Sequence, residues 1–387
     1  MANPSPRRLI YLSSAGDRAG GEINLQRVLQ HLDTSKYQPL VLCCQEGSYA
    51  PALQQAGINV MTIPFILSRS AMLNPSLLLH NITSLQEVYK ILSRPELDLI
   101  VINDNLVLKL LLPVLLLCPK PMLYMIRNYE SKRLWMIDLL FRTRIKKAIA
   151  VSHSVKTYFD ETLRLPPELI TAINTGIDTS VLNIQKRVDI RAELGIPHHA
   201  RLVGMFARFD AWKGHQVFLR AAKRILQNLP NIHFLIAGES RNATLFPRFS
   251  LVKHEVIQTT QQPALKENVH ILPWREDVAA IMKEIDIVVC PSEREPFGLT
   301  IIEGLAIGTA VIAADSGGAP EAIRHLSNGI LFKTNDDEDL ASWIVRLLQD
   351  DLLRRQLIAQ ARIDIDTRFN FKRFVQTIEA TYEGILQ

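Results

Sequence analysis

Residues 285–315 read IDIVVCPSEREPFGLTIIEGLAIGTAVIAAD. A short apolar run rich in β-branched residues leads through a polar turn into a segment of helical period, from about Gly298 to Ile307, and then into a second apolar run. Parallel neighbouring strands need a crossover connection of this kind. The stretch therefore predicts a strand, a helix and a second parallel strand, which is the repeating unit of an α/β fold.

Two glutamates stand out in this stretch because their neighbours are mostly apolar, small or turn-forming. Glu295 lies in the turn at the carboxyl end of the first strand, and Glu303 lies on the helix. An ionised carboxylate that is buried without a partner loses its hydration at high cost. Hydroxyl groups of a sugar or a ribose would satisfy both carboxylates by charge-assisted hydrogen bonds. The alternative is that Glu295 is solvated in the turn and Glu303 lies on a thin exposed stripe.

The same alternation of strands and helices runs through both halves of the chain. Strands are predicted in the first half at Leu9–Ser13, Pro39–Cys43, Val60–Ile63, Leu99–Ile102, Met122–Ile126 and Ala148–Val151. In the second half they are predicted at Leu202–Phe206, His233–Ala237, Val269–Leu272, Ile287–Cys290 and Ala310–Ala313, with Gly329–Phe332 at an edge. Since 387 residues exceed the size of one growing core, two α/β domains are expected, 1–180 and 181–368, joined near Ile173–Ile190. Ligands of such sheets bind at the carboxyl ends of the strands.

The charge is unevenly distributed along the chain. Residues 1–182 contain 19 Lys and Arg against 14 Asp and Glu, and the remainder contains 25 of each, so the net +5 lies in the first half. That half is expected to meet any anionic partner. The four cysteines have no metal-ligand spacing, so buried, reduced thiols and a cytoplasmic protein are expected. The apolar run Leu106–Leu117 is too short to cross a bilayer and is predicted to be a core helix.

Two further loops follow predicted strands. Ser13–Leu29 contains Gly16, Gly20 and Gly21 just before a helix, a pattern that favours phosphate but also occurs in plain tight turns. Gly204–Ala222 places Arg208 and Lys213 around a helix start, where they would clamp a diphosphate or be merely solvated cations.

Together these stretches resemble the retaining glycosyltransferases of family 4. PSEREPFGLTIIEGLAIGTAVIAADSGGAPEAI (291–323) resembles the E-x7-E region of that family, and ARFDAWKG (207–214) resembles its GR…KG element, with Ala207 in place of a glycine. AIAVSHSVKTYF (148–159), NTGID (174–178) and the Gly20–Gly21 loop extend the resemblance over nearly the whole chain. It implies the GT-B fold: two facing Rossmann-like domains with a cleft between them, and a C-terminal helix (369–387) that crosses back to the first domain.

The resemblance also implies roles for individual residues. Arg208 and Lys213 would bind the diphosphate of a nucleotide-sugar donor, most simply a UDP-sugar, and Glu303 would bind the ribose. Glu295 would hold hydroxyls of the transferred sugar. The donor would also meet backbone groups of the first-domain glycines Gly20 and Gly21 and of the helix start, Phe297, Gly298 and Leu299.

Neither a metal nor a cofactor is expected, since the cations and helix N-termini can neutralise the leaving diphosphate. The one acidic triplet, Asp364–Asp366, is interpreted as surface charge on a polar helix. The family often carries a histidine after the fifth strand, whereas YMIRNYE places Arg127 there. Arg127 is hypothesised to serve an anionic donor sugar or acceptor, and nearby His153 to be structural.

The acceptor is not readable from the sequence, and no nucleic-acid partner is expected. The basic segment Ser131–Ala150 is interpreted as a helix that covers the sheet, with contact to the anionic cytoplasmic face of a membrane as the alternative. The leading hypothesis is a retaining, metal-independent glycosyltransferase. Its rivals are a nucleotide-sugar epimerase and a sugar-nucleotide-binding protein with a degenerate site.

Overall fold

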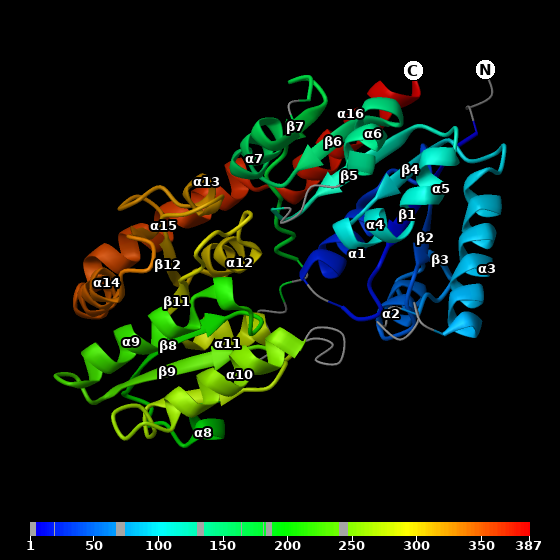
Figure 1. The fold of residues 1–387 in the computed structure, drawn as a ribbon. Helices are drawn as coiled ribbons and strands as arrows, with labels where there is room; N and C mark the ends of the chain where they lie inside the picture. The colour runs from blue at the N-terminus through cyan, green and yellow to red at the C-terminus, as the bar shows by residue number, and fades with distance from the viewer. Residues whose placement is uncertain are drawn as a thin grey trace. The chain divides into compact units, whose positions relative to one another are not determined.

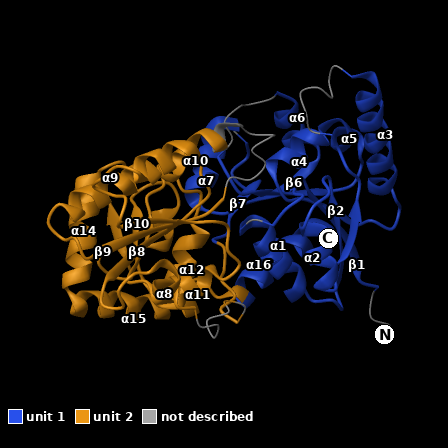
Figure 2. Ribbon diagram, turned by 90° about the horizontal axis from the view of Figure 1, so that it is seen from below, with its two compact units in different colours: residues 1–174, 372–387 blue, residues 175–371 orange. Residues whose placement is uncertain are grey.

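The computed structural model divides the chain into two compact units, each with one parallel sheet (Figures 1 and 2). It describes residues 5–18, 20–66, 74–129, 135–163, 165–180, 182, 188–239 and 247–387. Unit 1 comprises residues 1–174 and 372–387, and unit 2 comprises residues 175–371. The division falls at Asn174, whereas the sequence placed it at 180; residues 181 and 183–187 of the predicted connection lie outside the described residues.

Unit 1 contains a seven-stranded sheet in the order β3-β2-β1-β4-β5-β6-β7. The strands are β1 (Arg7–Ser13), β2 (Tyr37–Cys43), β3 (Asn59–Thr62), β4 (Leu99–Ile102), β5 (Met122–Ile126), β6 (Ile145–Ala150) and β7 (Ile170–Ala172). All neighbours are parallel. The central strands β4 and β5 are buried along their whole length, because helices cover both faces of a parallel sheet. Six of the strands agree with the prediction, and β7 was not predicted.

The helices of unit 1 follow the strands in the expected alternation (Figure 1). They are α1 (Gly20–His31), α2 (Tyr49–Gln55), α3 (Pro75–Leu92), α4 (Asn105–Leu110), α5 (Leu112–Leu117), α6 (Trp135–Thr143) and α7 (His153–Leu163). The predicted core helix at Leu106–Leu117 is two helices, α4 and α5. The chain breaks between them at Leu111, and Pro113 then occupies the first turn of α5, where a missing N–H costs nothing.

Unit 1 is completed by the last helix of the chain, α16 (Phe371–Leu386). The predicted stripe of Phe371, Phe374, Val375 and Ile378 is buried. The hydroxyls of Tyr382 and Tyr11 on β1 lie 2.7 Å apart in the core, and Glu379 accepts a 2.7 Å hydrogen bond from the Asp33 backbone. The prediction that the C-terminal helix returns to the first domain is therefore confirmed.

Unit 2 contains a six-stranded parallel sheet in the order β10-β9-β8-β11-β12-β13. The strands are β8 (Arg201–Phe206), β9 (Ile232–Ala237), β10 (Val269–Leu272), β11 (Ile287–Cys290), β12 (Ala310–Ala314) and β13 (Ile330–Phe332). Its helices are α8 (Ile190–Leu194), α9 (His215–Leu226), α10 (Pro247–Thr260), α11 (Val278–Glu284), α12 (Leu299–Ile307), α13 (Ala319–Ala322), α14 (Asp337–Gln349) and α15 (Asp351–Arg368). All six strands were predicted, with β13 at an edge.

Both units thus have the doubly wound architecture that the sequence predicted. In the described part of the chain, no helix combines the length and apolarity that a bilayer crossing requires. All four cysteines are free and buried, as expected.

Candidate active site

The candidate site of unit 2 lies where the strand order changes direction. The chain adds strands on one side of β8 up to β10 and then returns to place β11 on the other side of β8. At such a switch point the loops after the two central strands diverge and leave a crevice at the carboxyl edge of the sheet. The loop 207–214 follows β8, and the loop 291–298 follows β11. Lys213 comes from the first loop and Glu295 from the second.

Lys213 and Glu295 form a buried ion pair across this switch point. Lys213 Nζ donates to Glu295 Oε2 at 2.8 Å, and the two side chains are 16% and 8% exposed. The ammonium also lies 4.0 Å from the centre of the Trp212 ring, a favourable cation–π distance. The sequence predicted both residues as site residues, and the fold brings them into contact over 82 positions of chain.

The carboxylate of Glu295 is held in its charged form. Burial raises the pKa of Glu295, but the charge and hydrogen bond of Lys213, together with hydrogen bonds from Ser292 and Cys290, lower it more, so that the pKa lies below its ordinary value. Cys290 Sγ lies 3.7 Å from Glu295 Oε2. The site therefore presents an ionised acceptor for hydroxyl groups beside an ammonium that is suited to phosphate.

The start of α12 adjoins this pair. Gly298 precedes the helix with a left-handed backbone (φ +99°), and no side chain caps the helix start. A side chain at Gly298 would meet Ile301 at 2.5 Å and Glu295 Cγ at 3.3 Å, so glycine is required here. The uncapped N–H groups of the first turn give the helix start a partial positive charge. This is the environment that an oxygen-rich anion prefers.

The other predicted residues of unit 2 lie around this pair. Arg208 is exposed on the same loop as Lys213, and Glu303 is half-buried on α12, on a stripe with Leu299 and Ala306. Phe297 has a buried side chain that packs against Phe369, with ring centres 6.0 Å apart. Glu295 is therefore not solvated, whereas the half-exposed position of Glu303 fits both of the interpretations that the sequence allowed.

In unit 1, Gly20 and Gly21 are the first two residues of α1, at the carboxyl edge of the sheet. The preceding loop is held by Asp104, which accepts hydrogen bonds from the Ser14 backbone (2.8 Å) and hydroxyl (2.7 Å). Arg127 follows β5 at the same edge. His153 is exposed as the first residue of α7.

The interpretation of the acidic triplet as surface charge is wrong for Asp364. Its side chain is 2% exposed and joins Arg324 (2.5 Å), Arg368 (3.0 Å) and the Asn328 amide (2.7 Å). The helix α15 turns this carboxylate inward, toward Arg324, which is 40 positions away, and toward Arg368 one turn later on the same helix, while Asp366 is exposed. Asp364 is thus an internal structural anchor. Among the described residues, no group of three or more acidic, His or Cys side chains could hold a metal.

The basic segment contributes a helix that covers the sheet, as the sequence favoured. Ile137, Leu140 and Phe141 of α6 are buried in the core of unit 1. On the outer side Trp135 is 72% exposed and Leu139 is 40% exposed. Lys132 and Arg133 of this segment lie outside the described residues.

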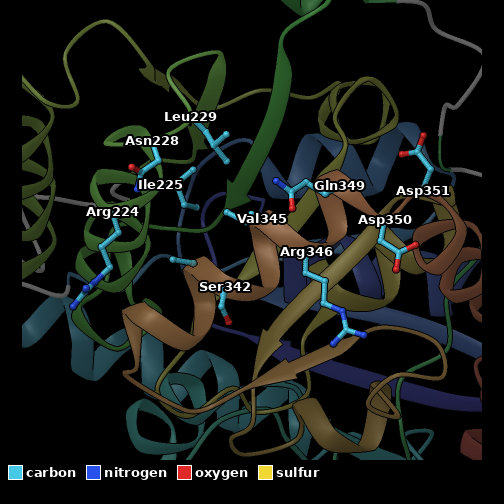
Figure 3. Close-up of a pocket in the computed structure, with 11 residues that line it drawn as sticks. Arg224, Ile225, Asn228, Leu229, Ser342, Val345, Arg346, Gln349, Asp350 and Asp351 are labelled. Atoms are coloured by element: carbon cyan, nitrogen blue, oxygen red, sulfur yellow. The ribbon is translucent and has the colours of Figure 1, made fainter.

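A hollow of unit 2 lies away from these loops (Figure 3). It measures about 820 Å³ and is lined by the end of α9 with the residues that follow it and by α14 from Ala341 onward, including Arg224, Asn228, Ser342 and Arg346. Helices that follow parallel strands end at the opposite edge of the sheet from the strands' carboxyl ends. Arg224 is already paired with Asp337 at 2.6 Å. The geometry of the loops, rather than the size of this hollow, locates the candidate site.

Sequence reasoning missed the residues that surround the ion pair. Ser292 and Cys290 stabilise Glu295, Trp212 lies against Lys213, and His215 is 2% exposed and stacks on Phe209. The position of a small polar residue two places after the end of a buried strand was the available signal for Ser292. The burial of His215 could not be predicted, because a histidine that follows a loop is usually interpreted as a surface residue.

The fold and the residues at the carboxyl edges of the two sheets define a two-unit α/β protein with a Rossmann-like sheet in each unit. The model of the family described as glycosyl transferases group 1 matches residues 186–364, and that of glycosyltransferase family 4 matches residues 18–181. The chain belongs to the family 4 glycosyltransferases, and its fold is GT-B, as the resemblance implied.

Individual relatives are more distant. The chain is 26% identical over 223 residues to D-inositol 3-phosphate glycosyltransferase of Segniliparus rotundus, which covers 57% of this chain and 48% of that protein. It is 26% identical over 238 residues to N-acetyl-alpha-D-glucosaminyl L-malate synthase of Bacillus anthracis, covering 62% and 59%. The match thus spans about half the length of these curated relatives. The crystal structure of HepE from Anabaena in complex with UDP-glucose has the same fold, with a TM-score of 0.81 at 24% identity, over 97% of this chain and 99% of that one.

Proposed function

We propose that the protein is a retaining, metal-independent glycosyltransferase that moves a sugar from a nucleoside diphosphate sugar, of which a UDP-sugar is the expected form, to a hydroxyl group of an acceptor. The observation that carries this proposal is the buried Lys213–Glu295 pair beside the uncapped start of α12. One ammonium, one carboxylate and free backbone donors are the groups that a sugar diphosphate needs.

In this proposal each group has a separate task. Lys213 and Arg208 bind the diphosphate, and the backbone N–H groups at Phe297, Gly298 and Leu299 add hydrogen bonds. Glu295 accepts hydrogen bonds from hydroxyls of the transferred sugar, and Glu303 from those of the ribose. Gly20 and Gly21 at the start of α1 are proposed to contact phosphate oxygens through their backbone. HepE, which shares this fold, has been crystallised with UDP-glucose.

The reaction breaks the bond between the anomeric carbon and the diphosphate oxygen, so negative charge grows on the leaving group. Lys213, Arg208 and the positive ends of α9 and α12 would stabilise that charge without a metal. The departing phosphate oxygen would accept the proton of the attacking hydroxyl on the same face of the sugar, which retains the anomeric configuration. No side-chain base is required for this sequence.

The names of the two relatives suggest the kind of acceptor. D-inositol 3-phosphate and L-malate are small hydroxyl compounds that carry an anionic group. We propose an acceptor of the same class, a hydroxyl compound with a phosphate or a carboxylate.

We also propose that unit 1 makes a peripheral contact with an anionic membrane. Neighbouring helices α3, α5 and α6 expose Leu78, Leu79, Ile82, Tyr89, Leu117, Trp135 and Leu139 on their outer sides. Exposed apolar side chains beside an excess of cations favour a lipid surface with negative charge. Co-sedimentation with vesicles containing phosphatidylglycerol, compared with neutral vesicles, tests this contact; Trp135→Ser together with Leu139→Ser should reduce it.

The main test combines UDP binding with turnover. UDP should raise the melting temperature of the protein, because it binds only the folded state. Lys213→Gln should abolish this shift, while Lys223→Gln, a matched exposed lysine at the far end of α9, should not. Equal behaviour of the two variants would contradict the assignment. A labelled UDP-sugar incubated without an acceptor separates the rivals: an epimerase changes the sugar, a transferase leaves or slowly hydrolyses it, and a degenerate binder never transfers it.

A further inference from the structure

Unit 1 contains a second charged position at the switch point of its own sheet. The strand order there reverses between β1 and β4, so the loops after these strands and after β5 lie at one edge. Asn103 follows β4, Arg127 follows β5, and Gly21 lies in the first turn of the helix after β1. The side chains of Asn103 and Arg127 have no part in the donor-binding assignment, which uses Gly21 only through its backbone.

The guanidinium of Arg127 is anchored by a neutral partner. Its Nε donates to the Asn103 carbonyl oxygen at 3.1 Å, and its Nη2 donates to Asn103 Oδ1 at 2.7 Å. Asn103 is 1% exposed, so it fixes the guanidinium from the protein side. The described part of the chain places no carboxylate within ion-pair distance of Arg127. Its positive charge is therefore held in position without being neutralised.

Asp104, an acidic residue whose charge influences Arg127, does not take that role. Asp104 accepts from Ser14 and from the Val107 backbone at the start of α4. Burial lowers the pKa of Arg127, and the charges of Glu22 and Asp104 offset part of that effect. Since an arginine remains protonated throughout the physiological range, this is a partly desolvated cation with acidic neighbours but without a direct carboxylate partner.

The remaining face of the guanidinium is open toward α1. Within the described residues Nη1 donates no hydrogen bond, and Nη2 donates only the one to Asn103. A side chain at Gly21 would lie 3.9 Å from Arg127 Cδ and 4.0 Å from Nη1, which is ordinary contact without a clash. Gly21 is also not in the left-handed region. The fold therefore does not require glycine there, but glycine keeps this face of Arg127 uncovered.

A second buried donor lies at the same place. Asn103 Nδ2 is buried and has no hydrogen-bond partner, although the other atom of the same amide anchors Arg127. Buried donors are rarely left unsatisfied in folded proteins. A buried donor that lacks an acceptor beside an unneutralised cation indicates that the missing partner is an anion.

We propose that Arg127, anchored by Asn103 and left open at Gly21, binds a carboxylate or a phosphate carried by the substrate itself and distinct from the donor diphosphate. Nη1 and Nη2 would hold two oxygens of that group in a bidentate contact. The anion belongs either to the acceptor or to the transferred sugar, as in a uronic acid. The inference rests on the proposed transferase function and specifies its substrate class.

The test compares ligands that differ in one anionic group. Calorimetric titration of the full chain uses UDP-glucuronate against UDP-glucose, and D-inositol 3-phosphate against inositol with and without UDP. The wild type should bind the anionic member of at least one pair about tenfold tighter or more. The donor pair responds if the anion is on the sugar, and the inositol pair responds if it is on the acceptor.

Three variants give the assignment its controls. Arg127→Gln should bring the two members of the pair to about equal affinity while UDP affinity stays within about twofold. Asn103→Asp keeps the acceptor atom but neutralises the guanidinium, and should have the same effect even if Arg127→Gln folds poorly. Arg144→Gln is the matched control, since Arg144 also bonds a backbone carbonyl (Leu116, 3.2 Å) but precedes β6 at the opposite edge. It should retain the preference.

Two results would overturn the proposal. One is a wild type that shows no charge preference in either pair. The other is an Arg127→Gln variant that loses affinity for UDP itself, which would assign Arg127 to the diphosphate. Failure of the proposed function has a different signature: the wild type would not bind UDP, whereas the inositol pair measured without UDP would still report on Arg127.

Discussion

The two sheets each present a cation at the switch point, but the cations are held in opposite ways. In unit 2, Lys213 is paired with the carboxylate of Glu295 at 2.8 Å, and both are largely buried. In unit 1, Arg127 is held by the amide and carbonyl of Asn103, and no carboxylate pairs with it in the part of the chain that the structure describes. A charged anchor prearranges two functional groups together, whereas a neutral anchor leaves the full charge of the cation for a ligand.

The largest expected effect comes from breaking the charged anchor. Lys213→Met leaves Glu295 buried without its counter-ion, so the free energy of unfolding should fall by about 3–5 kcal/mol, and UDP binding should be lost. The double variant Lys213→Met/Glu295→Gln should recover most of the stability but none of the activity. Urea unfolding and turnover assays measure the two quantities. Equal losses of stability in the single and double variants would show that the pair is not coupled.

The comparable substitution in unit 1 should lower the free energy of unfolding only slightly. Arg127→Gln removes a cation whose partner is neutral, so no buried charge is left behind, and unfolding should shift by about 1 kcal/mol, the scale of an ordinary hydrogen bond. A loss as large as that of Lys213→Met would mean that Arg127 has a structural role, and the contrast between the two anchors would fail.

The acid sensitivity of unit 2 should centre on His215, which packs next to Lys213. Burial, and then the charge of Lys213, lowers the pKa of His215 to about 4. The unfolded chain protonates near the ordinary value of about 6.5, so it binds more protons than the folded protein between these values. The contribution of neutral His215 to the free energy of unfolding should therefore be fully present above about pH 6.5. It should fall by roughly 3 kcal/mol as the pH approaches 4.

His215→Phe provides the control for that pH dependence. Phenylalanine can keep the stacking on Phe209, whose ring centre lies 5.0 Å from that of His215, but it cannot take up a proton. Unfolding measured from pH 7 to 4 should be flatter for this variant by the amount assigned to His215. An unchanged slope would mean that other groups, such as the buried Asp364, dominate the acid response.

The glycines at the two helix starts should change stability in opposite directions when they are replaced. Gly298→Ala places a Cβ in a left-handed position 2.5 Å from Ile301, and should cost about 2 kcal/mol. Gly21→Ala meets no such clash, and should stabilise the protein by about 0.5 kcal/mol through the unfolded state, while lowering activity because it covers Arg127. Thermal unfolding measures the two stability changes, which should have opposite signs, and turnover assays measure the activity of Gly21→Ala. A stable, fully active Gly21→Ala variant would contradict the open face of Arg127.

Hydrophobic periodicity predicted the fold closely. Runs such as Leu99–Ile102 and Ile287–Cys290 can only be buried on both faces, so their positions and the helices between them follow from the sequence. Strand β7 was not predicted because its three residues are too few to show a hydrophobic period. The break between α4 and α5 was not predicted because an apolar stripe runs through both helices, so that the effect of Pro113 is not visible in the pattern.

The chemistry of the site was only partly readable. The sequence itself established that Glu295, Lys213 and Arg208 follow strand ends, because loop position depends on local pattern. Contact between Lys213 and Glu295, the inward turn of Asp364 and the anchoring of Arg127 by Asn103 join residues that are 82, 40 and 24 positions apart. Such contacts depend on strand order, which a sequence pattern does not encode. Tertiary structure alone decided which charge is paired and which is left for a ligand.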